Sequence, residues 1–125
     1  MNLSPHFTLD ELTHTDHREI DNVPNEAEIA NLKRLADFLE QVKSVLAGKP
    51  IMVNSAFRCK ALNDAVGSKD TSQHRVGCAA DIRVPGMTPD EVVRAVIASG
   101  IGYDQVIREF DRWTHISVPN GAGDK

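Results

Sequence analysis

The chain has 125 residues, which is the size of one domain and too short for two well-buried cores. Hydrophobic residues make up 41% and charged residues 26%, which excludes an intrinsically disordered chain and predicts a globular one. The formal net charge of −4 argues against a nucleic-acid partner, because no basic stripe is present to neutralise phosphates.

The N-terminus has no basic region followed by an apolar run, so we expect no secretory signal. No apolar stretch approaches the roughly 20 residues that a membrane-spanning helix needs. We therefore expect a protein that is made in the cytoplasm and has no membrane partner. We also expect it to be a monomer.

The first part of the chain predicts two helices. A capping box at residues 8–11 predicts that a short helix begins there. After a loop at 21–24, apolar residues recur at intervals of three and four from about residue 26 to 46, and Gly48-Lys49-Pro50 ends the segment. This long helix is expected to be scaffold.

The remainder predicts short strands and helices. In chain order we expect a strand at 51–54, a helical turn or two at 60–66, a polar loop at 68–75, a strand at 79–84, a helix from the capping box at 88–91 to about 99, and a hairpin with strands at 105–109 and 113–118. The pattern is typical of an α+β domain with a small, mainly antiparallel sheet and two to three helices. That domain is expected to occupy residues 1–119, followed by a flexible tail at 120–125.

The polar and small residues of segment 72–81 include two candidate metal ligands. His74 comes from a polar loop, and Asp81 follows seven residues later on an otherwise apolar strand. A carboxylate is costly to bury there unless it is paired or bound to a metal. Gly77 permits a turn that would bring the two side chains together. In the alternative interpretation, Asp81 caps a neighbouring group and His74 lies on the surface.

His115, on the last expected strand, is the third candidate ligand. A lone histidine on a strand is more often structural, but with His74 and Asp81 it completes a set of two imidazoles and one carboxylate. Such a set leaves a fourth position open for water, as catalytic zinc sites do. The sequence therefore predicts one bound zinc ion.

The general base is expected to be a carboxylate near this ion, and Glu109 and Asp111 are the candidates. A three-residue turn at 110–112 would place Glu109 opposite Trp113 and on the same face as His115. A two-residue turn would shift the pairing by one residue and point Glu109 away. Asp111 would lie in the turn in both cases, where aspartate is common for local reasons. We favour Glu109.

At this point the sequence resembles the M15 family of zinc peptidases. The resemblance rests on a SxHxxGxAxD signature at residues 72–81, on Ser-Ala-Phe-Arg at 55–58 and on Trp-x-His at 113–115. It begins near residue 7 and ends around residue 118. The family includes D-alanyl-D-alanine carboxypeptidases and phage endolysin-like enzymes, and it shares a fold with the hedgehog signalling domain.

The resemblance implies that the zinc ligands are His74, Asp81 and His115. It also implies that Ser55 and Arg58 lie near the substrate, where the arginine would assist the oxyanion or hold a substrate carboxylate. A terminal carboxylate would suit a carboxypeptidase, and an internal one an endopeptidase. The alternative for Arg58 is a surface ion pair.

Three further positions carry weaker expectations. Many family members have glutamate three residues before the last histidine, where this chain has Arg112, whereas the hedgehog-type glutamate lies six residues before it and matches Glu109. Ser72 and Gln73 are candidates for orienting the imidazole of His74 or for touching substrate.

The function expected from these observations is zinc-dependent hydrolysis of an amide bond in the stem peptide of bacterial peptidoglycan. The enzyme would be a D-Ala-D-Ala carboxypeptidase or an L-Ala-D-Glu-type endopeptidase, such as a phage lytic enzyme that reaches the wall after release. One alternative is an inactive zinc-containing module that binds peptidoglycan or protein. Another is a structural protein in which zinc serves stability.

The two cysteines and the three remaining histidines are expected to take no part in the metal site. Cys59 and Cys78 predict two buried free thiols, with an extra ligand or a disulfide as the alternative. His6, His14 and His17 lie near the N-terminus, where nothing completes a ligand set, and are expected on the surface.

Overall fold

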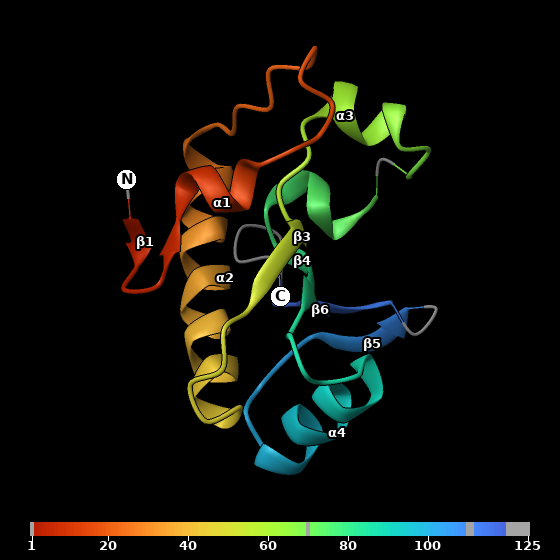
Figure 1. Cartoon of the computed structure of the whole chain (residues 1–125). Helices are drawn as coiled ribbons and strands as arrows, with labels where there is room; N and C mark the ends of the chain where they lie inside the picture. The colour runs from red at the N-terminus through yellow and green to blue at the C-terminus, as the bar shows by residue number, and fades with distance from the viewer. Residues whose placement is uncertain (1, 70, 110–111, 120–125) are drawn as a thin grey trace.

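The computed structural model describes residues 2–69, 71–109 and 112–119 (Figure 1). In this part of the chain, α-helices lie beside two antiparallel sheets, which confirms the expected α+β class. The tail expected at 120–125 lies outside the described residues. No described helix is long and apolar enough to cross a membrane.

The described residues form four α-helices and one short 3-10 helix. The α-helices are α1 (Leu9–Thr13), α2 (Glu26–Val45), α3 (Lys60–Ala65) and α4 (Pro89–Ser99). Capping boxes begin three of them, because Thr8, Asn25 and Thr88 each exchange hydrogen bonds with a glutamate three residues later. The number exceeds the expected two to three because α1 and α3 are only five and six residues long.

The 3-10 helix, η1 (Gln73–Val76), begins within the segment 68–75 that was expected to be a loop and ends one residue beyond it. The Ser72 hydroxyl accepts a hydrogen bond from the backbone N–H of His74 at 3.2 Å, which caps this turn. Gly77 ends it with a φ of 81°, a left-handed conformation that favours glycine. The glycine that ends this helix could therefore be recognised in the sequence, whereas the 3-10 helix before it could not.

The larger sheet has four antiparallel strands in the order β3-β4-β6-β5. Its strands are β3 (Met52–Ser55), β4 (Ala79–Arg83), β5 (Gln105–Glu109) and β6 (Trp113–Ser117). A second, two-stranded sheet pairs β1 (Asn2–Ser4) with β2 (Phe7–Thr8) at the N-terminus. These two strands were not expected, since they are too short to show an alternating pattern.

One face of the larger sheet packs against the hydrophobic core. Figure 1 shows the long helix α2 running beside the sheet, with α4 at the end near β5. The core cluster joins leucines of α2 to alternate strand residues: Leu32, Leu35, Leu39, Ala80, Ile82 and Ile116. Residues between these on the strands project from the opposite face, which we call the front face. Asp81 and His115 lie on the front face as a direct cross-strand pair.

Both cysteines carry free thiols. Cys78 is buried and Cys59 is half-buried, so the expectation of free thiols is confirmed and that of full burial holds for Cys78 alone. Burial raises the pKa of the Cys78 thiol. Its reactivity is therefore low, and a packing role suffices for it.

Candidate metal centre

The structure brings His74, Asp81 and His115 together at one point. Each offers one ligand atom, and the three atoms lie within 4.8 Å of one another. Asp81 and His115 meet because their residues pair across β4 and β6. His74 arrives from η1, where the turn closed by Gly77 returns the chain to β4.

The ring of His74 is held in one orientation. Its Nδ1 lies 2.7 Å from the backbone oxygen of Ala56, in a buried position. Because a carbonyl oxygen only accepts, Nδ1 must donate, and the lone pair is left on Nε2. This Nε2 lies 3.4 Å from Asp81 Oδ2. The second ring nitrogen of metal-binding histidines commonly has such a partner.

His115 approaches the same carboxylate from the other side. Its Nδ1 lies 2.9 Å from Asp81 Oδ1, and only 14% of its side chain is exposed. The His74 and His115 rings meet edge to face, with their centroids 5.3 Å apart. One nitrogen from each ring and the carboxylate oxygens thus face a shared space. Two imidazoles with one carboxylate fit a zinc ion that keeps a further position for water.

The electrostatics of Asp81 favour the ionised form. Burial alone would raise the pKa of this carboxyl, but hydrogen bonds and charge from His115 and His74 hold the pKa well below its ordinary value. Arg58 adds a cation, with its Nη2 3.6 Å from Asp81 Oδ2. A deprotonated carboxylate is the form that a metal ion requires.

Arg58 and Ser55 lie next to the ligand set. Ser55 pairs with Asp81 across β3 and β4, and its hydroxyl accepts a hydrogen bond from Arg58 Nε at 3.2 Å. Burial lowers the pKa of Arg58, while the charge of Asp81 opposes that change. Both side chains line a cavity of about 200 Å³ whose other wall includes His14 and His17. The expected surface histidines therefore border a cavity beside the candidate centre.

Ser72 and Gln73 contact groups other than the His74 imidazole. Ser72 caps the backbone of η1, and the Gln73 side-chain amide donates to the carboxylate of Asp104. The same carboxylate accepts from the Ser117 hydroxyl at 3.2 Å. Gln73 and Ser117 therefore tie η1 to the loop before β5 and to β6.

Glu109 lies on the front face of the sheet, as the candidate ligands Asp81 and His115 do. It pairs with Trp113 across β5 and β6, which leaves three residues in the connection between the strands. This is the register of the predicted three-residue turn, in which Glu109 lies on the same face as His115. His115 is its diagonal neighbour, and such pairs are roughly 7–8 Å apart. Glu109 is half-buried and lies outside the group of three atoms described above. Asp111 lies outside the described residues.

Two groups that support the site were missed in the sequence. The Ala56 carbonyl orients His74, and Asn22 holds the segment that carries it. The Asn22 amide donates to the backbone oxygens of Thr13 and Phe57 at 3.0 and 2.9 Å, and its oxygen accepts from Cys59 N at 2.7 Å. A sequence pattern cannot show which backbone carbonyl will accept a hydrogen bond from His74. Asn22 could not be recognised either, because it is 35 residues from Phe57.

Comparison with known proteins agrees with this geometry. No curated protein matches the chain. A family model described as Peptidase M15 matches residues 5–117, which include every candidate ligand and Glu109. The M15 peptidases are zinc enzymes, and the donor set of the candidate centre fits that metal. The chain therefore belongs to the M15 family of peptidases.

Proposed function

We propose that the chain is a zinc-dependent peptidase that hydrolyses an amide bond in the stem peptide of bacterial peptidoglycan. The convergence of His74, Asp81 and His115 within 4.8 Å carries this proposal. The substrate class follows from the resemblance to cell-wall enzymes. The two candidate reactions are D-Ala-D-Ala carboxypeptidase and L-Ala-D-Glu-type endopeptidase activity.

The three ligands would hold the ion with little rearrangement. His74 has a lone pair on Nε2 because Nδ1 donates to the Ala56 carbonyl. Asp81 is ionised, and its oxygens already lie 2.9 Å from His115 Nδ1 and 3.4 Å from His74 Nε2. A bound zinc ion would supply Lewis-acid polarisation of the scissile carbonyl and acidify a water molecule.

Glu109 is the residue we assign as general base. Its carboxylate would accept a proton from the attacking water and later donate it to the leaving amine. Position on the front face, diagonal to His115, supports this role.

Arg58 is assigned to substrate binding. Its Nε is held by Ser55, and Nη2 lies against Asp81. The donors of its planar guanidinium that remain would face the adjoining cavity, where they can bind a carboxylate or a developing oxyanion. Ser55 fixes the orientation of the guanidinium. Ser72 and Gln73 remain proposed substrate contacts at the edge of the site.

The test is digestion of purified peptidoglycan by the zinc-loaded chain, with release of new amino groups as the measurement. Hydrolysis is expected to stop with a chelator and return with zinc. Glu109→Gln is expected to lower the rate at least 100-fold, in line with the 10²–10⁴-fold contribution of general acid–base catalysis, while zinc content stays at one per chain. Glu26→Gln, an exposed position on α2, is the matched control.

Three outcomes would contradict the proposal in different ways. Full activity of Glu109→Gln would remove this residue from the mechanism. One zinc per chain without cleavage of any wall peptide would favour the binding module instead. Unfolding on zinc removal, again without cleavage, would favour a structural metal. Mass analysis of released fragments would identify the bond.

A further inference from the structure

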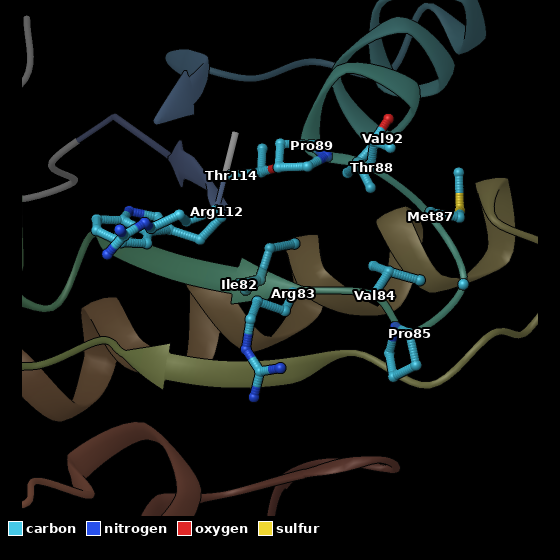
Figure 2. A pocket seen from close by; sticks show the side chains of 12 residues that line it. Ile82, Arg83, Val84, Pro85, Met87, Thr88, Pro89, Val92, Arg112 and Thr114 are labelled. Carbon is cyan, nitrogen blue, oxygen red and sulfur yellow. The ribbon is translucent and has the colours of Figure 1, made fainter. Parts of the chain in front are cut away.

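Two of the candidate ligands lie near one end of the β4–β6 ladder. The last pair in that direction is Ile82–Thr114, directly after Asp81–His115. A cavity of about 340 Å³ then lies between the ends of the two strands and the start of α4 (Figure 2). Figure 2 also shows Arg83, the next residue of β4, turned towards β3. At this end the ladder therefore stops one pair after the ligands.

At the other end of the ladder, one carboxylate joins separate segments of the chain. Asp104 lies in the loop between α4 and β5, and its Oδ2 accepts a hydrogen bond from the side-chain amide of Gln73. The same oxygen accepts from the Ser117 hydroxyl at 3.2 Å. The backbone N–H of Asp104 also donates to the backbone oxygen of Ser117 at 2.9 Å. Asp104 therefore links the start of η1 to the end of β6.

These two segments carry the two imidazoles of the candidate centre. Gln73 directly precedes His74, and Ser117 lies two residues after His115 on the front face of β6. Strand pairing fixes His115 relative to Asp81, whereas His74 comes from η1 and has no place in the ladder. A side chain that bridges η1 and β6 therefore limits how far the two imidazoles can separate.

Other contacts of His74 hold it from the opposite side. Its Nδ1 lies 2.7 Å from the backbone oxygen of Ala56, and its own backbone oxygen accepts from Arg58 N at 2.9 Å. Both residues follow β3, which lies on the far side of β4 from β6. Zinc holds its ligand atoms at distances fixed to within about 0.2 Å. Restraints from both sides would arrange the ligands before the ion binds.

We propose that Asp104 is a positioning residue for the metal centre, acting through Gln73 and Ser117 to hold the two imidazoles at the spacing that zinc needs. The inference rests on the zinc site of the proposed function, and it assigns part of the metal affinity to a residue outside the ligand set. Because Asp104 is exposed, its effect comes from these hydrogen bonds rather than from core packing. The side-chain oxygen of Gln73 remains for the substrate contact proposed above.

The test measures zinc affinity, by competition with a fluorescent chelator, in the wild type and in matched variants. Asp104→Ala removes the acceptor of both side-chain hydrogen bonds. Asp104→Asn keeps an uncharged oxygen that can accept both. Asp37→Ala, at an exposed position of α2, is the control. Thermal unfolding of the zinc-free chains measures stability, and the visible spectrum of the cobalt(II)-loaded chains reports the coordination geometry.

Asp104→Ala is expected to weaken zinc binding about tenfold or more, within the 10–100-fold range of groups that orient metal ligands, and to change the cobalt spectrum. Asp104→Asn should recover most of the affinity and the wild-type spectrum, and Asp37→Ala should change neither. Adding Gln73→Ala to Asp104→Ala should cause little further loss, because both changes remove the same contact.

Unchanged zinc affinity in Asp104→Ala would overturn the inference, even if the zinc-free chain were less stable. An equal loss in Asp104→Asn would also overturn it, because charge rather than position would then be the cause. Zinc binding is measured without substrate, so the two proposals can fail separately. A wild type that binds zinc but cleaves no wall peptide would contradict the proposed function, while the affinities of the variants decide the inference. A wild type that binds no zinc would overturn both.

Discussion

The five histidines fall into two groups that use carboxylates differently. Three near the N-terminus each face one acidic side chain of their own, and between 42% and 59% of each imidazole is exposed. The other two share a single buried carboxylate, Asp81, and are 4% and 14% exposed. The surface pairs are His6–Glu40 at 2.7 Å, His14–Asp16 at 3.4 Å and His17–Glu19 at 3.4 Å.

A short distance between an imidazole and a carboxylate does not by itself identify a metal centre. His6 lies closer to its carboxylate than either imidazole of the candidate centre lies to Asp81. What distinguishes the centre is convergence of three donors, burial, and a backbone acceptor that fixes the ring of His74. An exposed pair gains little because water screens it. A buried shared carboxylate is stable only with several partners.

The largest expected effect follows from removing a ligand. Asp81→Asn and His115→Ala should each weaken zinc binding by more than about 100-fold, beyond the 10–100-fold usual for outer partners, and should abolish hydrolysis. His14→Ala, at the surface, should leave zinc affinity within about twofold of wild type. Competition with a fluorescent zinc chelator measures both. An equal loss of zinc affinity in the His14 and His115 variants would show that the N-terminal histidines take part in zinc binding as well.

The second largest effect is expected from a change at Gly77, in the turn between His74 and Asp81. A Cβ added at Gly77 would lie 2.9 Å from the Glu28 oxygen and 3.0 Å from Leu32 Cγ, at a φ of +81°. Gly77→Ala should therefore destabilise the fold by about 3 kcal/mol and weaken zinc binding. Gly67, with a φ of +75° and open space around it, is the matched position, where alanine should cost about 1 kcal/mol. Urea unfolding measures the free energy of unfolding of both variants. Similar losses of stability would show that the close approach of Gly77 to α2 does not matter.

The segment behind His74 offers a smaller effect. Asn22→Ala removes hydrogen bonds to Thr13, Phe57 and Cys59, at an expected cost of about 2 kcal/mol and a severalfold loss of zinc affinity. Asn25→Ala should cost about 1 kcal/mol by removing the cap of α2, without changing zinc affinity. Thermal unfolding and zinc titration measure the two quantities. An unchanged affinity in Asn22→Ala would separate this residue from the metal centre.

The surface group should give the smallest effect, with a defined pH dependence. Burial would raise the pKa of Glu40, but hydrogen bonds from Ser4 and His6 lower it overall. A carboxyl with a lowered folded-state pKa stabilises the fold above its unfolded pKa, and this stabilisation is lost as pH falls through the folded value. Glu40→Gln should cost under about 1 kcal/mol at pH 7, and the difference from wild type should shrink below about pH 4. A difference that persists at pH 3 would exclude ionisation as its cause.

Local pattern accounts for what the sequence predicted well. The strand-like residues around Asp81 and His115 predicted the two strands that carry them, and capping boxes predicted the starts of α1 and α4. Residue spacing on the hairpin reduced the placement of Glu109 to two alternatives. The paired register with Trp113 then selects between them.

Long-range contacts account for what the sequence could not predict. The last strand, β6, lies between β4 and β5, an order that depends on packing against α2 and α4 rather than on any local pattern. Orientation of His74 depends on a carbonyl 18 residues earlier in the chain. The cavity at the end of β4 is lined by residues from Ile82 to Thr114, which come from two strands and α4, so no motif marks it.

The most direct test of the account is an anomalous difference map at the zinc absorption edge, from crystals of the chain grown with zinc. Zinc bound by the three proposed ligands would give one strong peak about 2.0–2.2 Å from His74 Nε2, His115 Nδ1 and a carboxylate oxygen of Asp81. A peak coordinated instead by the histidines of the N-terminal segment would contradict it. So would the absence of a peak between His74 and His115.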